Sequence, residues 1–273
     1  MDYYREPTMS DSTLTFIKLG GSLITDKRES QHFHQAIMQR AAGEIVQALA
    51  AQPSLRLLIG HGSGSFGHVA AQKYGTATGV HSLDAWRGYA EVATIARRLN
   101  SLVVEALFEA GLPVLSIQPS SSAQCDDGKI ISMAVEPIRA ALEHQLVPVV
   151  YGDVALDSQR GGTIISTETI FFTLAESLHP ARIMLLGEVE GVYDASGNII
   201  PHITPDNLES IATALGGSHG TDVTGGMASK VRQMVALAQQ LPGLQIRIFS
   251  GTTPGQIESA VTGQSAPGTL ITA

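Results

Sequence analysis

The sequence of 273 residues has little cysteine, few aromatic residues and little charge. Its single cysteine, Cys125, excludes a disulfide within the chain and fits a reducing compartment, so we expect a cytoplasmic protein. No pattern of His or Asp residues surrounds Cys125, and we therefore interpret it as an ordinary small residue rather than a nucleophile. Charged residues make up only 15% of the chain and hydrophobic residues 44%, which indicates a globular protein with a sizeable core.

The sequence also lacks positive charge in excess and long apolar runs. Its formal net charge of −8 argues against nucleic acid or an anionic membrane surface as a partner. No stretch reaches about 18 consecutive apolar residues, so no membrane span is indicated. Residues 1–13 have no hydrophobic signal-like core, and we expect a disordered leader before a single domain of residues 14–273. A phosphorylated small molecule stays compatible with this composition, because a few lysines at one site can outweigh a distant acidic surface.

Short apolar runs alternate along the chain with longer amphipathic segments. The runs predict buried strands at residues 13–19, 55–59, 114–118, 147–151, 182–186 and 245–249. The amphipathic segments predict helices at residues 35–51, 83–110, 135–144 and 229–240. This alternation predicts an α/β fold in which a largely parallel sheet carries helices on both faces. Ligands bind at the carboxyl ends of the strands in such folds, so we expect a site there.

The first predicted strand ends in the run Lys18-Leu19-Gly20-Gly21-Ser22. Two glycines after a strand let backbone N–H groups turn toward an anion, and the lysine adds a positive charge. The run is neither a P-loop nor the Rossmann glycine pattern, and a tight turn beside a surface lysine explains it equally well. Lys27, which follows shortly after, reads by itself as a solvated surface charge.

The second predicted strand ends in GHGSGSFGH, residues 60–68. Its glycines leave room for a phosphate against the N–H groups of the turn. The residues from Gly67 onward can begin a helix whose positive end faces the same place. We interpret His61, at the strand end, as structural. His68 fits a ligand of a phosphate and a solvated loop residue equally well.

Further glycine-rich or charged runs lie at residues 151–154, 187–193 and 222–230. In the last of these, Thr224, Gly225 and Gly226 precede a predicted helix with Lys230 in its first turns, which is another arrangement that suits an anion. A capped helix after a loop explains this run as well. Together these motifs are the parts that phosphoryl transfer needs, because that reaction depends mainly on positioning and on well-placed positive charge.

With these motifs, the chain resembles the amino acid kinase superfamily and, within it, the isopentenyl phosphate kinases. The resemblance runs from about Thr15 to Ile271, and its most specific marks are Ser65-Phe66-Gly67-His68, Thr25-Asp26-Lys27 and residues 222–227. It implies an αβα sandwich around a largely parallel sheet, and a homodimer. It implies ATP and Mg²⁺ as cofactors, and transfer of a phosphoryl group from ATP to isopentenyl phosphate in isoprenoid biosynthesis.

The resemblance also implies roles for single residues. Part of the chain up to about residue 150 would bind the phosphoryl acceptor, and the rest would bind ATP. The implied catalytic residues are Lys18, Lys27 and His68. The implied nucleotide contacts are Lys18, Gly20, Gly21, Ser22, Gly64, Glu188, Gly191, Tyr193, Gly226 and Lys230. The implied contacts to the acceptor are Ser63, Gly67, His68 and Thr167 at its phosphate, and Tyr89, Val92, Val154 and Ile164 around its apolar tail. Without the resemblance, the last four are simply core-facing positions.

Several positions depart from the family pattern. Ser63 stands where a glycine is usual, and Glu168, Glu188 and Glu190 stand where aspartates are usual. A glutamate keeps the charge but lengthens the arm, so carboxylates near Lys18 and the metal can sit differently. Two alternatives therefore stay open. One is another small-molecule kinase, above all a fosfomycin-type kinase, which shares the histidine and would need a polar pocket behind the phosphate. The other is a nucleotide-binding protein without catalysis.

Overall fold

The computed structural model describes residues 13–26, 29, 31–215 and 226–273. The side chains of residues 68–70 and 212–215 are not described within this range. The predicted leader therefore lies outside the described residues, except for Thr13, which belongs to the first strand. Among the described helices, none is both long and apolar enough to cross a membrane.

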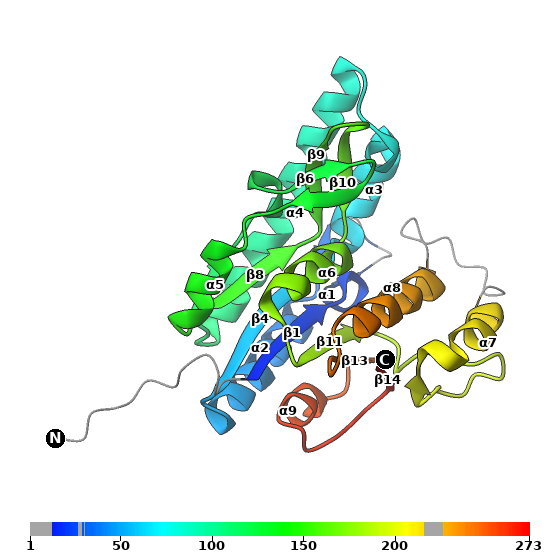
Figure 1. Cartoon of the computed structure of the whole chain (residues 1–273). Helices are drawn as coiled ribbons and strands as arrows, with labels where there is room; N and C mark the ends of the chain where they lie inside the picture. The colour runs from blue at the N-terminus through cyan, green and yellow to red at the C-terminus, as the bar shows by residue number, and fades with distance from the viewer. Residues whose placement is uncertain (1–12, 27–28, 30, 216–225) are drawn as a thin grey trace.

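Eight strands form the central sheet, in the order β12-β14-β13-β11-β1-β4-β8-β5 (Figure 1). Neighbouring strands run parallel, apart from β13 and β14, which are antiparallel. The carboxyl ends of β1, β4, β8 and β11 consequently lie side by side at one edge, as the pairing of Leu19 with both His61 and Leu186 shows. The strands are β1 (Thr13–Leu19), β4 (Leu55–His61), β5 (Val114–Ser116), β8 (Val147–Tyr151), β11 (Arg182–Gly187), β12 (His202–Ile203), β13 (Gln245–Ser250) and β14 (Thr269–Ile271).

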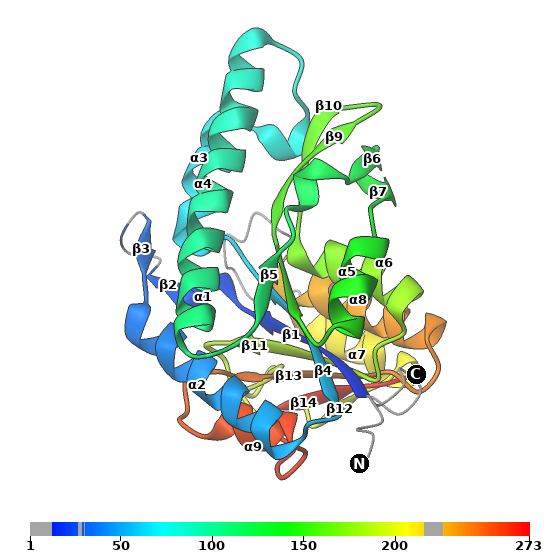
Figure 2. The ribbon, with the colours of Figure 1, turned by 90° about the vertical axis from the view of Figure 1, so that its left-hand side faces the viewer.

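Helices cover both faces of this sheet (Figure 2). One face carries α2 (Gln35–Ala51), α4 (Leu83–Glu109) and α9 (Gln256–Val261). The other carries α5 (Glu136–Glu143), α6 (Thr167–Leu178), α7 (Pro205–Leu215) and α8 (Gly226–Gln240). This is the predicted α/β fold, with a largely parallel sheet between two layers of helices.

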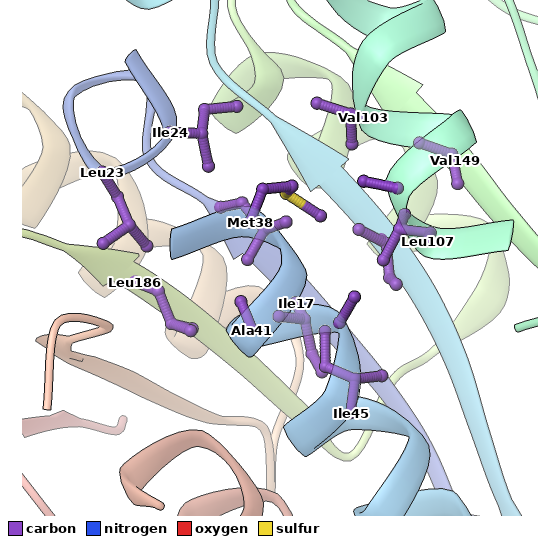
Figure 3. Packing of buried hydrophobic residues seen from close by; sticks show 14 of the residues in the cluster. Ile17, Leu23, Ile24, Met38, Ala41, Ile45, Val103, Leu107, Val149 and Leu186 are labelled. Atoms are coloured by element: carbon purple, nitrogen blue, oxygen red, sulfur yellow. The ribbon is translucent and has the colours of Figure 1, made fainter. Parts of the chain in front are cut away.

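The alternation of side chains along β1 decides what each face receives. Successive strand residues point to opposite faces. Ile17 packs with Met38 and Ile45 of α2 on one side (Figure 3), whereas Phe16 meets Phe171 of α6 on the other, with ring centroids 5.1 Å apart. Burying each such side chain contributes about 1.5–3 kcal/mol to folding. Lys18 shares the face of Phe16, and the strand therefore delivers its ammonium group toward α6 and α8.

A second, smaller sheet stands beyond the carboxyl edge, next to α3 (Gly64–Tyr74) and the far end of α4 (Figures 1 and 2). Its strand order is β10-β9-β6-β7. A hairpin of two short strands, β2 and β3, follows the short helix α1 (Gly21–Ile24). The sequence patterns predicted none of these strands, which are β2 (Thr25–Asp26), β3 (His32–Phe33), β6 (Gln124–Asp126), β7 (Lys129–Ser132), β9 (Asp153–Asp157) and β10 (Gly161–Ile165).

Six strands of the central sheet and the helices α2, α4, α5 and α8 were predicted with small differences in their bounds, whereas β12, β14, α6, α7 and α9 were not predicted. The predicted bounds of β1, β8 and α2 are those of the structure. The strand β4 continues through Gly60 to His61, so His61 is the last residue of this strand. The helix α3 begins at Gly64, three residues before the predicted start, and α8 begins at Gly226 rather than at residue 229.

Candidate active site

A cavity of about 380 Å³ lies at the shared carboxyl edge of the central sheet, where the sequence predicted a ligand site. It extends without interruption from the ends of β1 and β11 to the small residues of α3 and α4. Most of the predicted site residues line it: Lys18, Gly20, Gly21, Ser22, Ser63, Gly64, Gly67, Val92, Ile164, Thr167, Glu188 and Lys230.

The two glycine loops interlock at the floor of this cavity. A Cβ on Gly21 would collide with the backbone of Gly64, and a Cβ on Gly64 would collide with Thr25. Gly64 also has φ of +49°, a conformation that favours glycine. The Thr25 hydroxyl donates to the Gly21 carbonyl oxygen at 2.7 Å and accepts the Ser65 N–H at 2.9 Å. The glycines are therefore required because two backbone segments pass in contact, and Thr25 joins them.

Ser63, where the family usually has glycine, fits without strain. Its φ of −78° and ψ of −19° are open to any residue. Its side chain lies against Gly67, where a Cβ would come within 2.5 Å of the Ser63 Cβ and Oγ. The serine is accommodated because Gly67, one turn further along α3, has no side chain.

Three charged side chains meet at the other wall. The Glu168 Oε1, at the start of α6, lies 2.7 Å from the Lys18 Nζ and 3.5 Å from the Lys230 Nζ of α8. Lys18 and Glu168 are both buried. Burial alone would raise the pKa of Glu168, but the two ammonium groups outweigh it and hold the pKa at about 2. The carboxylate is therefore ionised at neutral pH and fixes the directions of both lysines.

Helix N-termini add partial positive charge around the cavity. The start of α6 contributes Ser166, Thr167 and Glu168 to the lining, and the Ser166 Oγ caps this helix by accepting the Thr169 N–H at 3.1 Å. The Thr167 hydroxyl donates to the His61 carbonyl oxygen at 2.6 Å, so that proton is committed to the backbone. Any contact of Thr167 with a phosphate would then come from its N–H group.

The other residues predicted to bind ATP or the acceptor phosphate do not all line the cavity. Lys27 and residues 222–225 lie outside the described residues. His68 lies in α3, on the helix that begins at the cavity, and its side chain is not described. Gly226 is the first residue of α8. Gly191 and Tyr193 do not line the cavity: Gly191 packs against Ile199 and Thr269, and Tyr193 pairs with Ile199.

The opposite end of the cavity is apolar. Val92 and Ile164 line it together with three alanines, Ala71, Ala77 and Ala96. Of the other predicted tail contacts, Val154 is fully buried in the core beneath, and Tyr89 packs edge-on against Trp86 with centroids 5.3 Å apart. The lining of this end therefore includes two of the four predicted residues.

Two functional candidates were not predicted as site residues. Glu168 was noted only as a departure from the family pattern, because its lysine partners are distant in sequence. Asp153 lines the cavity beside the apolar end, and its carboxylate accepts the N–H groups of Ser120 at 3.1 Å and Val154 at 2.9 Å. Burial raises the pKa of Asp153. Its place in the Tyr151-Gly152-Asp153-Val154 run at a strand end was the available signal.

Cys125 fits its interpretation as an ordinary residue. It is buried in the second sheet, and burial raises the pKa of its thiol to about 11, so little thiolate forms at neutral pH.

Comparison with known proteins defines the class. Residues 13–250 match the model of the amino acid kinase family, and the chain belongs to that family.

Within the family, several similar proteins are named isopentenyl phosphate kinase. An isopentenyl phosphate kinase of Methanothermobacter thermautotrophicus is 37% identical, over 95% of this chain and 99% of its own length. One of Haloferax volcanii is 38% identical, over 95% of this chain and 98% of its own length. A solved structure described as isopentenyl phosphate kinase superposes with a TM-score of 0.79 at 32% identity, covering 94% of this chain and all of that one.

Proposed function

We propose that this chain is an isopentenyl phosphate kinase, which transfers the γ-phosphoryl group of ATP to isopentenyl phosphate and releases isopentenyl diphosphate and ADP. One observation carries the proposal: a single cavity has lysines and glycine loops at one end and mainly apolar side chains at the other, with Asp153 beside them. The substrate has the same division, since a phosphate is joined to a short hydrocarbon tail. The names of the similar proteins support the same reaction.

The reaction needs no covalent nucleophile from the protein. An oxygen of the acceptor phosphate attacks the γ-phosphorus of ATP, and the bond to the bridging oxygen of ADP breaks. Charge is spread over the oxygens of the transferred group, so positioned positive charge lowers the barrier. Lys18 supplies that charge from the end of β1, and Glu168 holds its ammonium group in place at 2.7 Å. The glycine loops and the N-termini of α3 and α6 surround the phosphates with N–H groups.

The remaining assignments follow the two ends of the cavity. We place ATP toward Glu188 and Lys230, and the acceptor toward Ser63, Gly67 and His68, with Lys27 stabilising the transferred group. Val92 and Ile164 would contact the tail. Gly191 and Tyr193 are not among the residues that line the cavity, so we expect them to shape the loop after β11 rather than to touch ATP.

Mg²⁺ fits this site as an ion that binds together with ATP. Among the described residues, no group of three His, Cys, Asp or Glu side chains could hold a metal by itself. Mg²⁺ is commonly held by one or two carboxylates together with substrate phosphates. Glu188, which lines the nucleotide end, is the carboxylate best placed to assist, and bound Mg²⁺ would shield the negative charge of the phosphates.

The apolar end disfavours a fosfomycin-type kinase. A compact polar phosphonate would leave the surface of Ala71, Ala96 and Ile164 uncovered, whereas an isoprenoid tail removes it from water.

A cytoplasmic location and a homodimer are further parts of the proposal. The dimer has support from β5, which is an edge strand of the central sheet with the exposed side chains of Leu115 and, nearby on α4, Phe108.

Substitution of His68 tests the proposal directly. We expect His68→Gln to lower kcat/KM for isopentenyl phosphate by about 100-fold, because a charge-assisted hydrogen bond to the acceptor phosphate is lost. The KM for ATP should change little. Steady-state kinetics with product identification by mass spectrometry make the measurement. Undiminished kcat/KM in the variant would remove His68 from the site, and absence of isopentenyl diphosphate with the wild-type protein would overturn the function.

A further inference from the structure

The ring of His61 lies buried at the end of β4, in contact with Gly62, α4 and β8. Its Nδ1 is 3.1 Å from the Gly62 carbonyl oxygen, and its Nε2 is 3.2 Å from the side-chain Oδ1 of Asn100 in α4. The Nδ2 of Asn100 lies 2.7 Å from the Oγ of Ser116 in β5. The ring also stacks on Tyr151 of β8, with centroids 5.5 Å apart and planes at 11°. The phosphoryl transfer described above uses none of these side chains.

One arrangement of protons satisfies this chain of contacts with a neutral ring. The Gly62 carbonyl oxygen can only accept, so the Nδ1 carries the proton and the Nε2 accepts. This requires the carboxamide of Asn100 to be turned end for end, so that its NH₂ group donates to the Nε2 and its oxygen accepts the hydroxyl proton of Ser116. The two ends of a carboxamide have the same shape, and their partners decide which end faces the ring. Burial lowers the pKa of His61 to about 4, which keeps the ring neutral at pH 7.

The backbone on either side of Gly62 is fixed by other bonds. The His61 carbonyl oxygen accepts from the Thr167 Oγ1 at 2.6 Å and from the Gly152 N–H at 3.2 Å. The Gly62 N–H donates to the Leu19 carbonyl oxygen at 3.1 Å. Within the described part of the chain, the Gly62 carbonyl has the His61 ring as its hydrogen-bond partner. The peptide between Gly62 and Ser63 is therefore the unit whose direction depends on the ring.

That peptide lines the cavity at the glycine loop. A trans peptide points its N–H opposite to its C=O, so the bond that holds the Gly62 oxygen also turns the Ser63 N–H away from the ring. We propose that His61 is a positioning residue, whose Nδ1–H fixes the Gly62–Ser63 peptide with the Ser63 N–H toward the phosphates. The proposal rests on the proposed function. Asn100 and Ser116 keep the proton on the Nδ1, and without that bond the peptide can turn its carbonyl oxygen toward a phosphate and repel it.

Two substitutions of His61 separate the hydrogen bond from the volume of the ring. His61→Phe keeps a ring against Tyr151 but has no donor. His61→Asn is smaller, but its amide nitrogen can occupy the place of the Nδ1 and donate to Gly62. We expect His61→Phe to lose about 10- to 100-fold in kcat/KM for isopentenyl phosphate, and His61→Asn to stay within about threefold of the wild type. Both are assayed well below their melting temperatures. Full activity of His61→Phe, or an equal loss in both variants, would overturn the proposal.

The position of the proton gives a readout that does not depend on the substrate. Long-range ¹H–¹⁵N NMR spectra of the His61 ring should show the proton on the Nδ1 at pH 7. A proton on the Nε2 would contradict the proposal even if the enzyme is active. Conversely, a wild-type protein that shows the Nδ1–H form but does not phosphorylate isopentenyl phosphate would overturn the proposed function and leave the proton assignment standing.

Discussion

At the scale of single residues, Glu168 is important both for the stability of the fold and for the position of the lysines in the site. It is a buried carboxylate between two lysines that come from opposite ends of the sequence, one on β1 and one on α8. Lys18 needs this partner, because a buried ammonium group without a counter-charge is costly. The longer arm of glutamate, compared with the aspartate usual in the family, is enough to reach both lysines. The departure therefore preserves the charge pairing near the phosphates.

Substitution of Glu168 should cost both stability and activity. We expect Glu168→Gln to lower the free energy of unfolding by about 3 kcal/mol, because Lys18 stays buried without a charged partner. The kcat should fall by about tenfold or more, since both lysines lose their fixed directions. Urea unfolding and steady-state kinetics check the two effects, with Glu176→Gln on the exposed side of α6 as the matched control. A Glu168 variant with the stability and kcat of the control would contradict the charge pairing.

Acid should destabilise the protein in two steps of different origin. The pKa of His61 falls from 6.5 to about 4 on folding, so below pH 6.5 the unfolded chain takes up a proton that the folded chain does not. The free energy of unfolding is therefore unaffected by this group above pH 6.5 and falls by about 3 kcal/mol as the pH is lowered toward 4. Glu168, whose pKa falls from 4.5 to about 2, contributes stability that is present above pH 4.5 and lost toward pH 2.

Chemical denaturation of the wild type and of His61→Phe between pH 7 and pH 4.5 tests the first step. We expect the wild type to lose stability over this range and the variant to lose clearly less, because phenylalanine takes up no proton. Parallel slopes for the two proteins would mean that the His61 ring is not held neutral in the fold.

At the scale of elements, the site depends on two loops that cross in contact. The loop after β1 and the loop after β4 approach so closely that Gly21 and Gly64 have no room for a Cβ, and Thr25 bonds to both segments. The sequence predicted that both loops bind phosphate. It did not predict that they hold each other in place, because that contact depends on the register of β1 and β4.

A pair of glycine substitutions tests this contact. We expect Gly21→Ala to lower stability by about 2–3 kcal/mol and to abolish most activity, because the new methyl group forces the loops apart. The control is Gly43→Ala in the middle of α2, where a Cβ would meet no atom within 4 Å. That change should raise stability by about 0.5–1 kcal/mol and leave kcat unchanged. Thermal unfolding and kinetics of both variants give the comparison, and a fully active Gly21→Ala protein would contradict it.

Six strands of the central sheet were predictable, whereas β12, β14 and the second sheet were not. Strands such as β1 and helices such as α2 have apolar patterns that extend over several residues, and the bounds of both were predicted correctly. In contrast, β6 has three residues and β7 has four, mostly exposed ones, and a pattern this short has no measurable period. The loops of the site were found through their glycines. The ion pair between Lys18 and Glu168 could not be predicted, because the two residues are 150 positions apart and the sequence around each one does not indicate the other.

At the scale of the whole molecule, the fold places a charged region and an apolar region in one cavity. The central sheet brings Lys18, the glycine loops and Glu168 to one edge, and α3 and α4 extend past this edge beside the second sheet. The small side chains of these helices and Ile164 of β10 enclose the far end of the cavity. We therefore infer that the protein selects an acceptor with a phosphate at one end and a hydrocarbon tail at the other.

The most direct test of this claim is a comparison of acceptors under identical conditions with ATP and Mg²⁺. Isopentenyl phosphate is assayed beside fosfomycin, acetylglutamate and uridylate, and ADP formation is followed together with the phosphorylated product. We predict that kcat/KM for isopentenyl phosphate exceeds that for each of the other three by about 100-fold or more, because only its tail fills the apolar end of the cavity. An equal or higher kcat/KM for any of the other three acceptors would contradict the account.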